Sequence, residues 1–171
     1  CLPMTTTTPA TKTKVMKPVE HDVVVIGGGP GGYVAAIRAA QLGFNTACID
    51  ENPVFGGTCL RVGCIPSKAL LESSHLFHEA QHQMSVHGIK LPQVQLDLAT
   101  MMERKDKIVA QLTSGISMLL KRNKVTAYNG RGKLVGVGQI AVTTAQGAVA
   151  IKAKHIILAP GSKPAGMRGI D

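Results

Sequence analysis

Residues 21–32 read HDVVVIGGGPGG, and this stretch decides the predicted fold. The apolar run 23–26 is mostly β-branched, which is typical of a strand buried on both faces in a parallel sheet. Six residues follow, five of them glycine, and then an alanine-rich segment at 33–42 that predicts a helix. A second strand is predicted at 44–49, with Asp50 at its end. Together these segments predict one βαβ unit.

The glycines in this loop have the spacing of a dinucleotide-binding motif, Gly27-x-Gly29-x-x-Gly32. The first glycine allows a tight turn, the second allows the backbone to approach a pyrophosphate, and the third allows helix and strand to pack closely. The helix start offers free N–H groups to phosphates. Asp50 stands where a carboxylate can bind ribose hydroxyls. We therefore expect an adenine dinucleotide without a 2′-phosphate, either NAD or FAD.

A pair of cysteines follows shortly after, in the stretch GGTCLRVGCIPSK at residues 56–68. Zinc would need further ligands, and Cys1 and Cys48 lie far away in sequence. A purely structural disulfide between Cys59 and Cys64 would close a very short loop and constrain little of the unfolded chain. A redox-active pair beside a flavin is the interpretation that the flanking residues favour, since a helix is predicted to start here and Lys68 adds positive charge.

The remainder of the chain predicts two helices and then short strands. One helix is expected at residues 67–84, and a longer one from an N-cap at Asp97 to Arg122. The period then changes, and strands are predicted at residues 124–128, 133–135, 139–143, 148–151 and 155–159. His75, His78 and His82 share a helical face that we interpret as solvated, so no metal site is expected.

Composition excludes several classes of protein. The formal net charge is +9, but the basic residues are scattered and do not alternate with aromatics, so we expect no nucleic acid as partner. No apolar run has the length of a membrane span. Residues 1–20 lack arginine and apolar periodicity, which predicts a disordered extension and a cytoplasmic protein. Both ends are typical of a fragment, and a domain is predicted over residues 21–171.

The sequence GGTCLRVGCIPSKALL, at residues 56–71, closely resembles the active-site segment of the pyridine nucleotide–disulfide oxidoreductases. Its run IPSKALL favours the dihydrolipoamide dehydrogenase branch over mercuric and glutathione reductases, which share GGTC and VGC. The resemblance covers nearly all of residues 21–171. It implies an α/β fold, namely a Rossmann-like, three-layer FAD/NAD(P)-binding domain in which a parallel sheet with helices carries a small antiparallel β-meander.

The same resemblance implies that the cofactor is FAD. Pro160 departs from the usual residue and lacks one N–H donor, and Arg61 stands where the family usually has Asn. The FAD contacts carried over from the family's motifs are Gly27, Gly29, Pro30, Gly31, Gly32, Asp50, Gly57, Thr58, Lys68, Gly132, Pro160, Gly161 and Ser162.

The family's reaction is likewise an expectation. Cys59 would exchange with dihydrolipoamide, Cys64 would face the flavin, and NAD would be the final acceptor. Partners would be lipoyl domains of 2-oxo acid dehydrogenase or glycine-cleavage complexes, and the full-length protein would be a homodimer. The NAD-binding and dimerisation domains are absent, so these residues alone are expected to be inactive. The alternatives are a related flavin disulfide reductase and a non-catalytic flavin-binding module.

Overall fold

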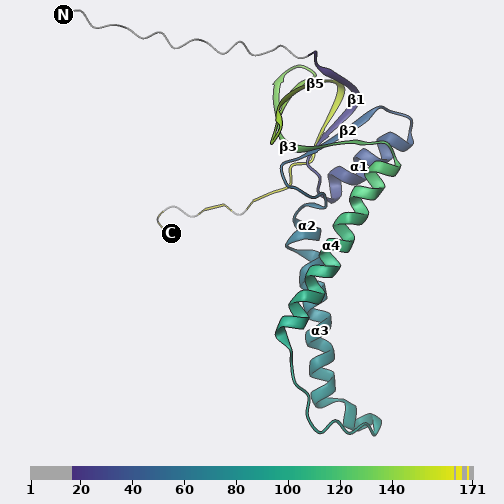
Figure 1. Cartoon of the computed structure of the whole chain (residues 1–171), viewed down its shortest axis with the longest axis vertical. Helices are drawn as coiled ribbons and strands as arrows, with labels where there is room; N and C mark the ends of the chain where they lie inside the picture. Colours follow the sequence, from purple (N-terminus) through teal and green to yellow (C-terminus); the bar gives the residue numbers. More distant parts are fainter. Residues whose placement is uncertain (1–16, 164, 167–168, 170–171) are drawn as a thin grey trace, which may run out of the picture.

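The computed structural model describes residues 17–163, 165–166 and 169. Figure 1 shows a ring of strands at one end of an elongated molecule and a pair of long helices, α3 and α4, projecting from it. The elements in chain order are β1 (Val19–Ile26), α1 (Pro30–Gln41), β2 (Thr46–Asp50), α2 (Gly57–Arg61), α3 (Cys64–His82), the 3₁₀ helix η1 (Met84–His87), α4 (Leu98–Arg122), β3 (Thr126–Gly136), β4 (Gln139–Thr144) and β5 (Gly147–Leu158).

The described strands form one mixed, closed sheet in the order β1-β2-β3-β4-β5. β1 pairs in parallel with both β2 and β5, and β2 pairs in parallel with β3. β4 closes the ring by antiparallel pairing with β3 and β5. The first part of β3 and the last part of β5 thus belong to the parallel strands, whereas their other halves pair with β4.

Two of the predicted strand pairs were wrong, because each pair is one continuous strand. The expected strands at 124–128 and 133–135 both overlap β3, and those at 148–151 and 155–159 both overlap β5. Glycine permits the close strand approach in β3, since a Cβ on Gly130 would lie 2.4 Å from the Thr143 carbonyl oxygen. The runs were separated by NGRG at residues 129–132 and by KAK at residues 152–154, which predicted breaks that pairing with β4 removes.

The strands separate two apolar cores. Val23, Val25 and Cys48 face the helices and pack with Ala36 of α1 and Leu120 of α4. The alternate residues of the same strands point into the ring, where Val24, Ala47 and Ile49 meet Ile140, Val142 and Ile151. Both faces of β1 are buried over residues 23–25, as the sequence predicted, and β2 is buried on both faces as well. The chain is thus an α/β domain in which helices cover the outer face of the parallel strands.

The helices differ from expectation mainly at their starts. α3 begins at Cys64 rather than at residue 67, and α2 was not predicted. The N-cap at Asp97 is confirmed, because its carboxylate accepts a hydrogen bond from the Thr100 backbone N–H. α3 and α4 are joined by Arg104, whose Nη1 donates to the Ala69 carbonyl at 3.0 Å. Within the described residues no helix is both long and apolar enough to cross a membrane.

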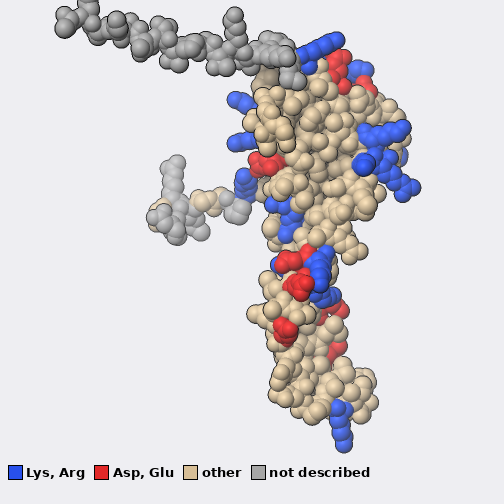
Figure 2. Space-filling view, viewed as in Figure 1, with Lys and Arg blue, Asp and Glu red and all other residues tan. Residues whose placement is uncertain are grey.

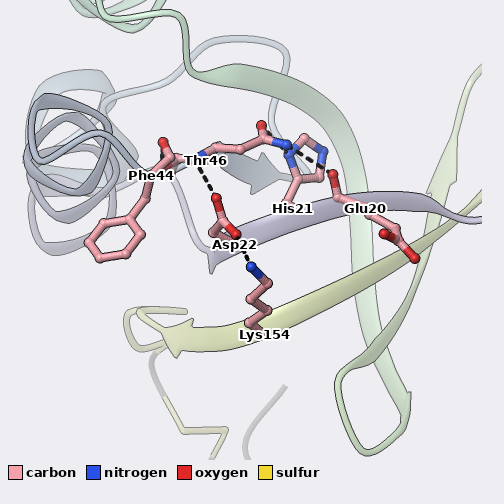
Figure 3. A network of polar contacts seen from close by, with 7 residues as sticks. Glu20, His21, Asp22, Phe44, Thr46 and Lys154 are labelled. Atoms are coloured by element: carbon pink, nitrogen blue, oxygen red, sulfur yellow. Dashed lines mark hydrogen bonds and ion pairs between the residues drawn. The ribbon is translucent and has the colours of Figure 1, made fainter.

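The amino ends of the parallel strands are held by the polar network in Figure 3. The Asp22 carboxylate pairs with Lys154 at 2.7 Å and accepts the Asn45 backbone N–H at 2.9 Å. The buried His21 ring lies 3.1 Å from the Asn45 amide oxygen. Lys154 lowers the pKa of Asp22, and Asp22 raises the pKa of Lys154. β1 begins at Val19, inside the predicted extension 1–20, whose first sixteen residues lie outside the described part.

Candidate functional site: a groove at the carboxyl ends of the parallel strands

The glycine loop between β1 and α1 is fixed by contacts within the protein. The Gly27 backbone N–H donates to the Ile49 carbonyl at 2.8 Å, and Gly27 has a φ of 111°, a conformation that favours glycine. A Cβ on Gly27 would lie 2.0 Å from the Ala159 carbonyl oxygen, and a Cβ on Gly32 would lie 1.6 Å from the Gly27 carbonyl oxygen. Gly27 and Gly32 therefore allow close packing of strand, loop and helix.

Gly29 is different, because the protein itself leaves room for a side chain there. A Cβ on Gly29 would meet only the Gly57 Cα, at an ordinary 3.8 Å, and its φ of −74° suits any residue. Gly29 also lines the groove described below. The space beside it is a cradle that a Cβ would fill, at the start of a twelve-residue helix with free N–H groups.

Asp50 closes the same loop from the end of β2. Its Oδ2 accepts the Gly28 backbone N–H at 2.5 Å, and its Oδ1 accepts from the backbone and side-chain nitrogens of Asn52 at 2.8 and 2.7 Å. The side chain is buried. Sequence reasoning assigned Asp50 only a ligand contact, and it missed this role in shaping the loop. A carboxylate oxygen has a further lone pair, so the predicted ribose contact stays compatible with the geometry.

These residues line an open groove of about 440 Å³ that runs from the glycine loop to Cys59. A second hollow of about 260 Å³ adjoins it through Gly27, Asp50 and Pro160 and extends to Gly132 on β3. Segments far apart in sequence thus meet at one sheet edge, as expected for parallel strands. The predicted residues that line the two hollows are Gly27, Gly29, Pro30, Asp50, Gly57, Thr58, Cys59, Gly132, Pro160, Gly161 and Ser162.

Four predicted site residues do not line this groove. Gly32 is buried in the packing of the loop. Gly31, Cys64 and Lys68 are exposed beside the groove, Gly31 in the first turn of α1 and the other two in the first turns of α3. The thirteen cofactor contacts therefore stay a prediction. Most of these residues line the groove or the hollow that adjoins it.

The two cysteines stand at the junction of α2 and α3. Cys59 is half-buried in α2, Cys64 is the exposed first residue of α3, and both are free thiols. The pKa of Cys59 is raised, chiefly because its thiol forms a hydrogen bond with the Cys64 side chain, and to a lesser extent by burial. The positive charge of Lys68 opposes this increase. The side chains of the pair are thus close enough to influence each other, although four residues separate them in sequence.

Cys48 and the histidines belong to other parts of the molecule. Cys48 is buried in β2, where desolvation raises its pKa to about 12, so it is inert at neutral pH. His75 pairs with Glu79 at 3.4 Å on α3, and the rings of His78 and His82 stack with centroids 4.4 Å apart. Among the described residues no group of three His, Cys, Asp or Glu side chains could hold a metal ion.

Four charged or polar residues in the groove were not identified as site residues from the sequence. Asn52 orients Asp50, and Glu51 forms an ion pair with Lys163 at 3.6 Å. Arg61 lines the groove near Cys59. The only available signal for Arg61 was its departure from the family's Asn. The sequence held no signal for Asn52, Glu51 or Lys163, because the loops that carry them have no pattern of apolar residues.

The fold agrees with comparisons to known proteins. The model of the pyridine nucleotide-disulphide oxidoreductase family matches residues 21–171, and the chain therefore belongs to this family. More specifically, the chain is a homologue of dihydrolipoyl dehydrogenase. The mitochondrial enzyme of Pisum sativum is 57% identical over 152 residues, which cover 88% of this chain and 30% of that protein.

Two further relatives have similar sequence identities to this chain. The leghemoglobin reductase of Vigna unguiculata is 57% identical over 88% of this chain and 29% of its own length. The mitochondrial dihydrolipoyl dehydrogenase of Rattus norvegicus is 53% identical over 90% of this chain and 31% of its own length. The chain therefore spans about a third of the length of these relatives.

Proposed function

We propose that this chain is the FAD-binding, redox-disulfide portion of a dihydrolipoyl dehydrogenase. The observation that carries the proposal is one groove that contains both the open cradle at Gly29 and the half-buried Cys59, whose thiol contacts Cys64. A phosphate-binding loop alone would support many dinucleotide proteins. A thiol pair of which Cys59 lines the same groove favours proteins that exchange electrons between a dithiol and a flavin.

The residues of the groove suit an extended dinucleotide. The space at Gly29 and the start of α1 suits a pyrophosphate. Asp50 and the hollow at Gly132 would lie toward the adenosine side, and Gly57, Thr58 and Cys59, which line the groove, would lie toward the flavin side. Gly31, Pro160, Gly161 and Ser162 would complete the cradle, and Lys68 would lie near the flavin ring. When bound, FAD supplies a two-electron acceptor beside Cys64.

The chain's own chemistry is thiol–disulfide exchange. With Cys59 and Cys64 joined as a disulfide, one thiolate of dihydrolipoamide attacks the Cys59 sulfur, and the Cys64 sulfur leaves with the electron pair. The second substrate thiol loses its proton and attacks the substrate sulfur of this mixed disulfide, which releases Cys59. Dihydrolipoamide is thereby oxidised to the cyclic disulfide, the protein disulfide is reduced to a dithiol, and the protons are conserved.

The remaining assignments extend the proposal to the whole protein. NAD would accept the electrons at a site outside these residues, and lipoyl domains of 2-oxo acid dehydrogenase or glycine-cleavage complexes would present the substrate. Full-length subunits would form a homodimer. The predicted cytoplasmic location gains no support from the Pisum sativum and Rattus norvegicus dihydrolipoyl dehydrogenases, which are named as mitochondrial. A mitochondrial location is the proposal that these two relatives favour.

The test is an anaerobic titration of the purified chain. We expect FAD to bind with a perturbed visible spectrum, and dihydrolipoamide to produce a long-wavelength absorption band that is lost in Cys64→Ala. FAD binding without this band would instead indicate a non-catalytic flavin-binding module, provided that a thiol assay shows that dihydrolipoamide has not reacted with Cys59 and Cys64. Reduction by glutathione but not by dihydrolipoamide would indicate a related disulfide reductase, and no flavin binding would contradict the proposal.

A further inference from the structure

Arg61 is the last residue of α2, two residues after Cys59. Its side chain is half-buried and lines the groove together with Gly29 and Pro30 of the glycine loop. Lys and Arg side chains are scattered over the face of the molecule in Figure 2, so overall charge does not single out this position. Arg61 is distinguished instead by its location in the groove.

The other charges of the groove already have partners. Both oxygens of Asp50 accept hydrogen bonds from the loop, and Glu51 pairs with Lys163 at 3.6 Å. Arg61 forms no ion pair with any residue of the described part of the chain. Its guanidinium is permanently charged and presents a planar fork of N–H donors, a geometry that matches phosphate oxygens.

We propose that Arg61 binds the pyrophosphate of the dinucleotide, in addition to the backbone N–H groups of the glycine loop. This inference rests on the proposed function and adds a charged contact to it. Gly29 and Pro30, which border the cradle, share the groove with Arg61. No carboxylate of the described residues lies within ion-pair distance of its guanidinium. An Asn at this position, as in most of the family, would supply an amide donor without the charge.

The experiment compares ligands that do and do not carry the pyrophosphate. Dissociation constants of FAD, ADP and adenosine are measured by calorimetry for the chain and for Arg61→Asn, Arg61→Lys and Arg122→Asn. Arg122 is an exposed arginine at the end of α4, so its variant controls for the lost net charge. Circular dichroism and thermal melting establish that each variant is folded.

We expect Arg61→Asn to weaken FAD and ADP about ten-fold and to leave adenosine unchanged, because a charge-assisted hydrogen bond contributes on that order. Arg61→Lys should lose less affinity for FAD and ADP than Arg61→Asn. Arg122→Asn should bind all three ligands as tightly as the unaltered chain. The affinity for ADP should also depend less on salt concentration in Arg61→Asn than in the unaltered chain.

Two results would overturn the inference while leaving the proposed function intact. One is unchanged ADP affinity in Arg61→Asn, and the other is an equal loss for ADP and adenosine, which would indicate a purely structural role. If the unaltered chain bound neither FAD nor ADP, the proposed function and this inference would both fail.

Discussion

Gly29 and Gly32 lie one helical turn apart in the same loop, and the structure uses them for different purposes. In Gly32→Ala the new Cβ would overlap the Gly27 carbonyl, at 1.6 Å, so the loop and helix must move apart. Overpacking of this kind costs about 3 kcal/mol of unfolding free energy. In Gly29→Ala the Cβ would make one ordinary contact with the protein but would occupy the cradle. We expect near-normal stability and a clear loss of FAD affinity.

Urea unfolding and FAD titration of both variants measure the two effects separately. Ser at position 29 is a useful companion, since it is equally small and favours helix starts. If Gly29→Ala and Gly29→Ser bound FAD as tightly as the unaltered chain, the cradle would not hold the dinucleotide.

The contact between Cys59 and Cys64 predicts a pH effect on reactivity. Because the hydrogen bond with Cys64 raises the pKa of Cys59, less thiolate is present at a given pH, and alkylation of Cys59 should be slow. Cys64→Ala removes this partner, so the pKa of Cys59 should fall. The rate of reaction with iodoacetamide at pH 8 should then rise.

Peptide mass spectrometry over a range of pH gives the alkylation rate of each cysteine. Cys48 is an internal control, because it is fully buried and has a pKa of about 12, and it should stay unmodified in the folded protein. A pH midpoint for Cys59 that is identical with and without Cys64 would contradict the hydrogen bond.

At the scale of elements, the start of α4 depends on one side chain. The Asp97 carboxylate accepts the Thr100 backbone N–H at 3.1 Å and its hydroxyl at 2.6 Å, and these hydrogen bonds lower the pKa of Asp97. Because the folded-state pKa is lowered, the stabilisation is present above the ordinary aspartate pKa of 3.8 and is lost as pH falls through the folded-state pKa. We expect Asp97→Ala to melt at a lower temperature than the unaltered chain at pH 7.

The matched variant is Asp97→Asn, because Asn caps helices about as well as Asp and does not ionise in this range. Its melting temperature should be close to that of the unaltered chain at pH 7. The gap between the unaltered chain and Asp97→Ala should narrow below pH 4, while the gap between Asp97→Asn and Asp97→Ala should persist. Parallel pH profiles for all three proteins would exclude the role of the ionised cap.

The whole molecule combines a closed ring of strands with the projecting α3–α4 hairpin (Figure 1). The ring strands are paired on both sides and enclose a core, whereas residues 85–97 at the end of the hairpin are almost all exposed. Local opening needs least free energy where few apolar contacts are broken. Brief trypsin treatment should therefore cut at Lys90 before any site in the strands.

Mass spectrometry of the first fragments tests this expectation. Lys133 in β3 is the matched site, because it is exposed but lies in a paired strand. Cleavage at Lys133 before Lys90 would indicate that the ring, rather than the hairpin, is the less stable part.

Local sequence determined much of the site. The strand, glycine loop and helix at residues 23–42, the capping aspartate at 97 and the cysteine pair each carry a short-range signal, because a buried strand, a tight turn and a helix start impose requirements on neighbouring residues. The homology to the disulfide oxidoreductases rests on these same segments and is confirmed by the family match.

The tertiary structure decided what lies between those segments. Only the parallel pairing of β1 with β2 and β5 brings the loop at Gly29, the end of β2 and residues 159–163 to one edge. Antiparallel pairing with β4 merges four predicted strands into β3 and β5. The folded loops also direct Asp50 onto the Gly28 N–H and place Arg61 in the groove. The physical reason is that such contacts depend on chain segments that meet only after folding, and no periodicity within one segment encodes them.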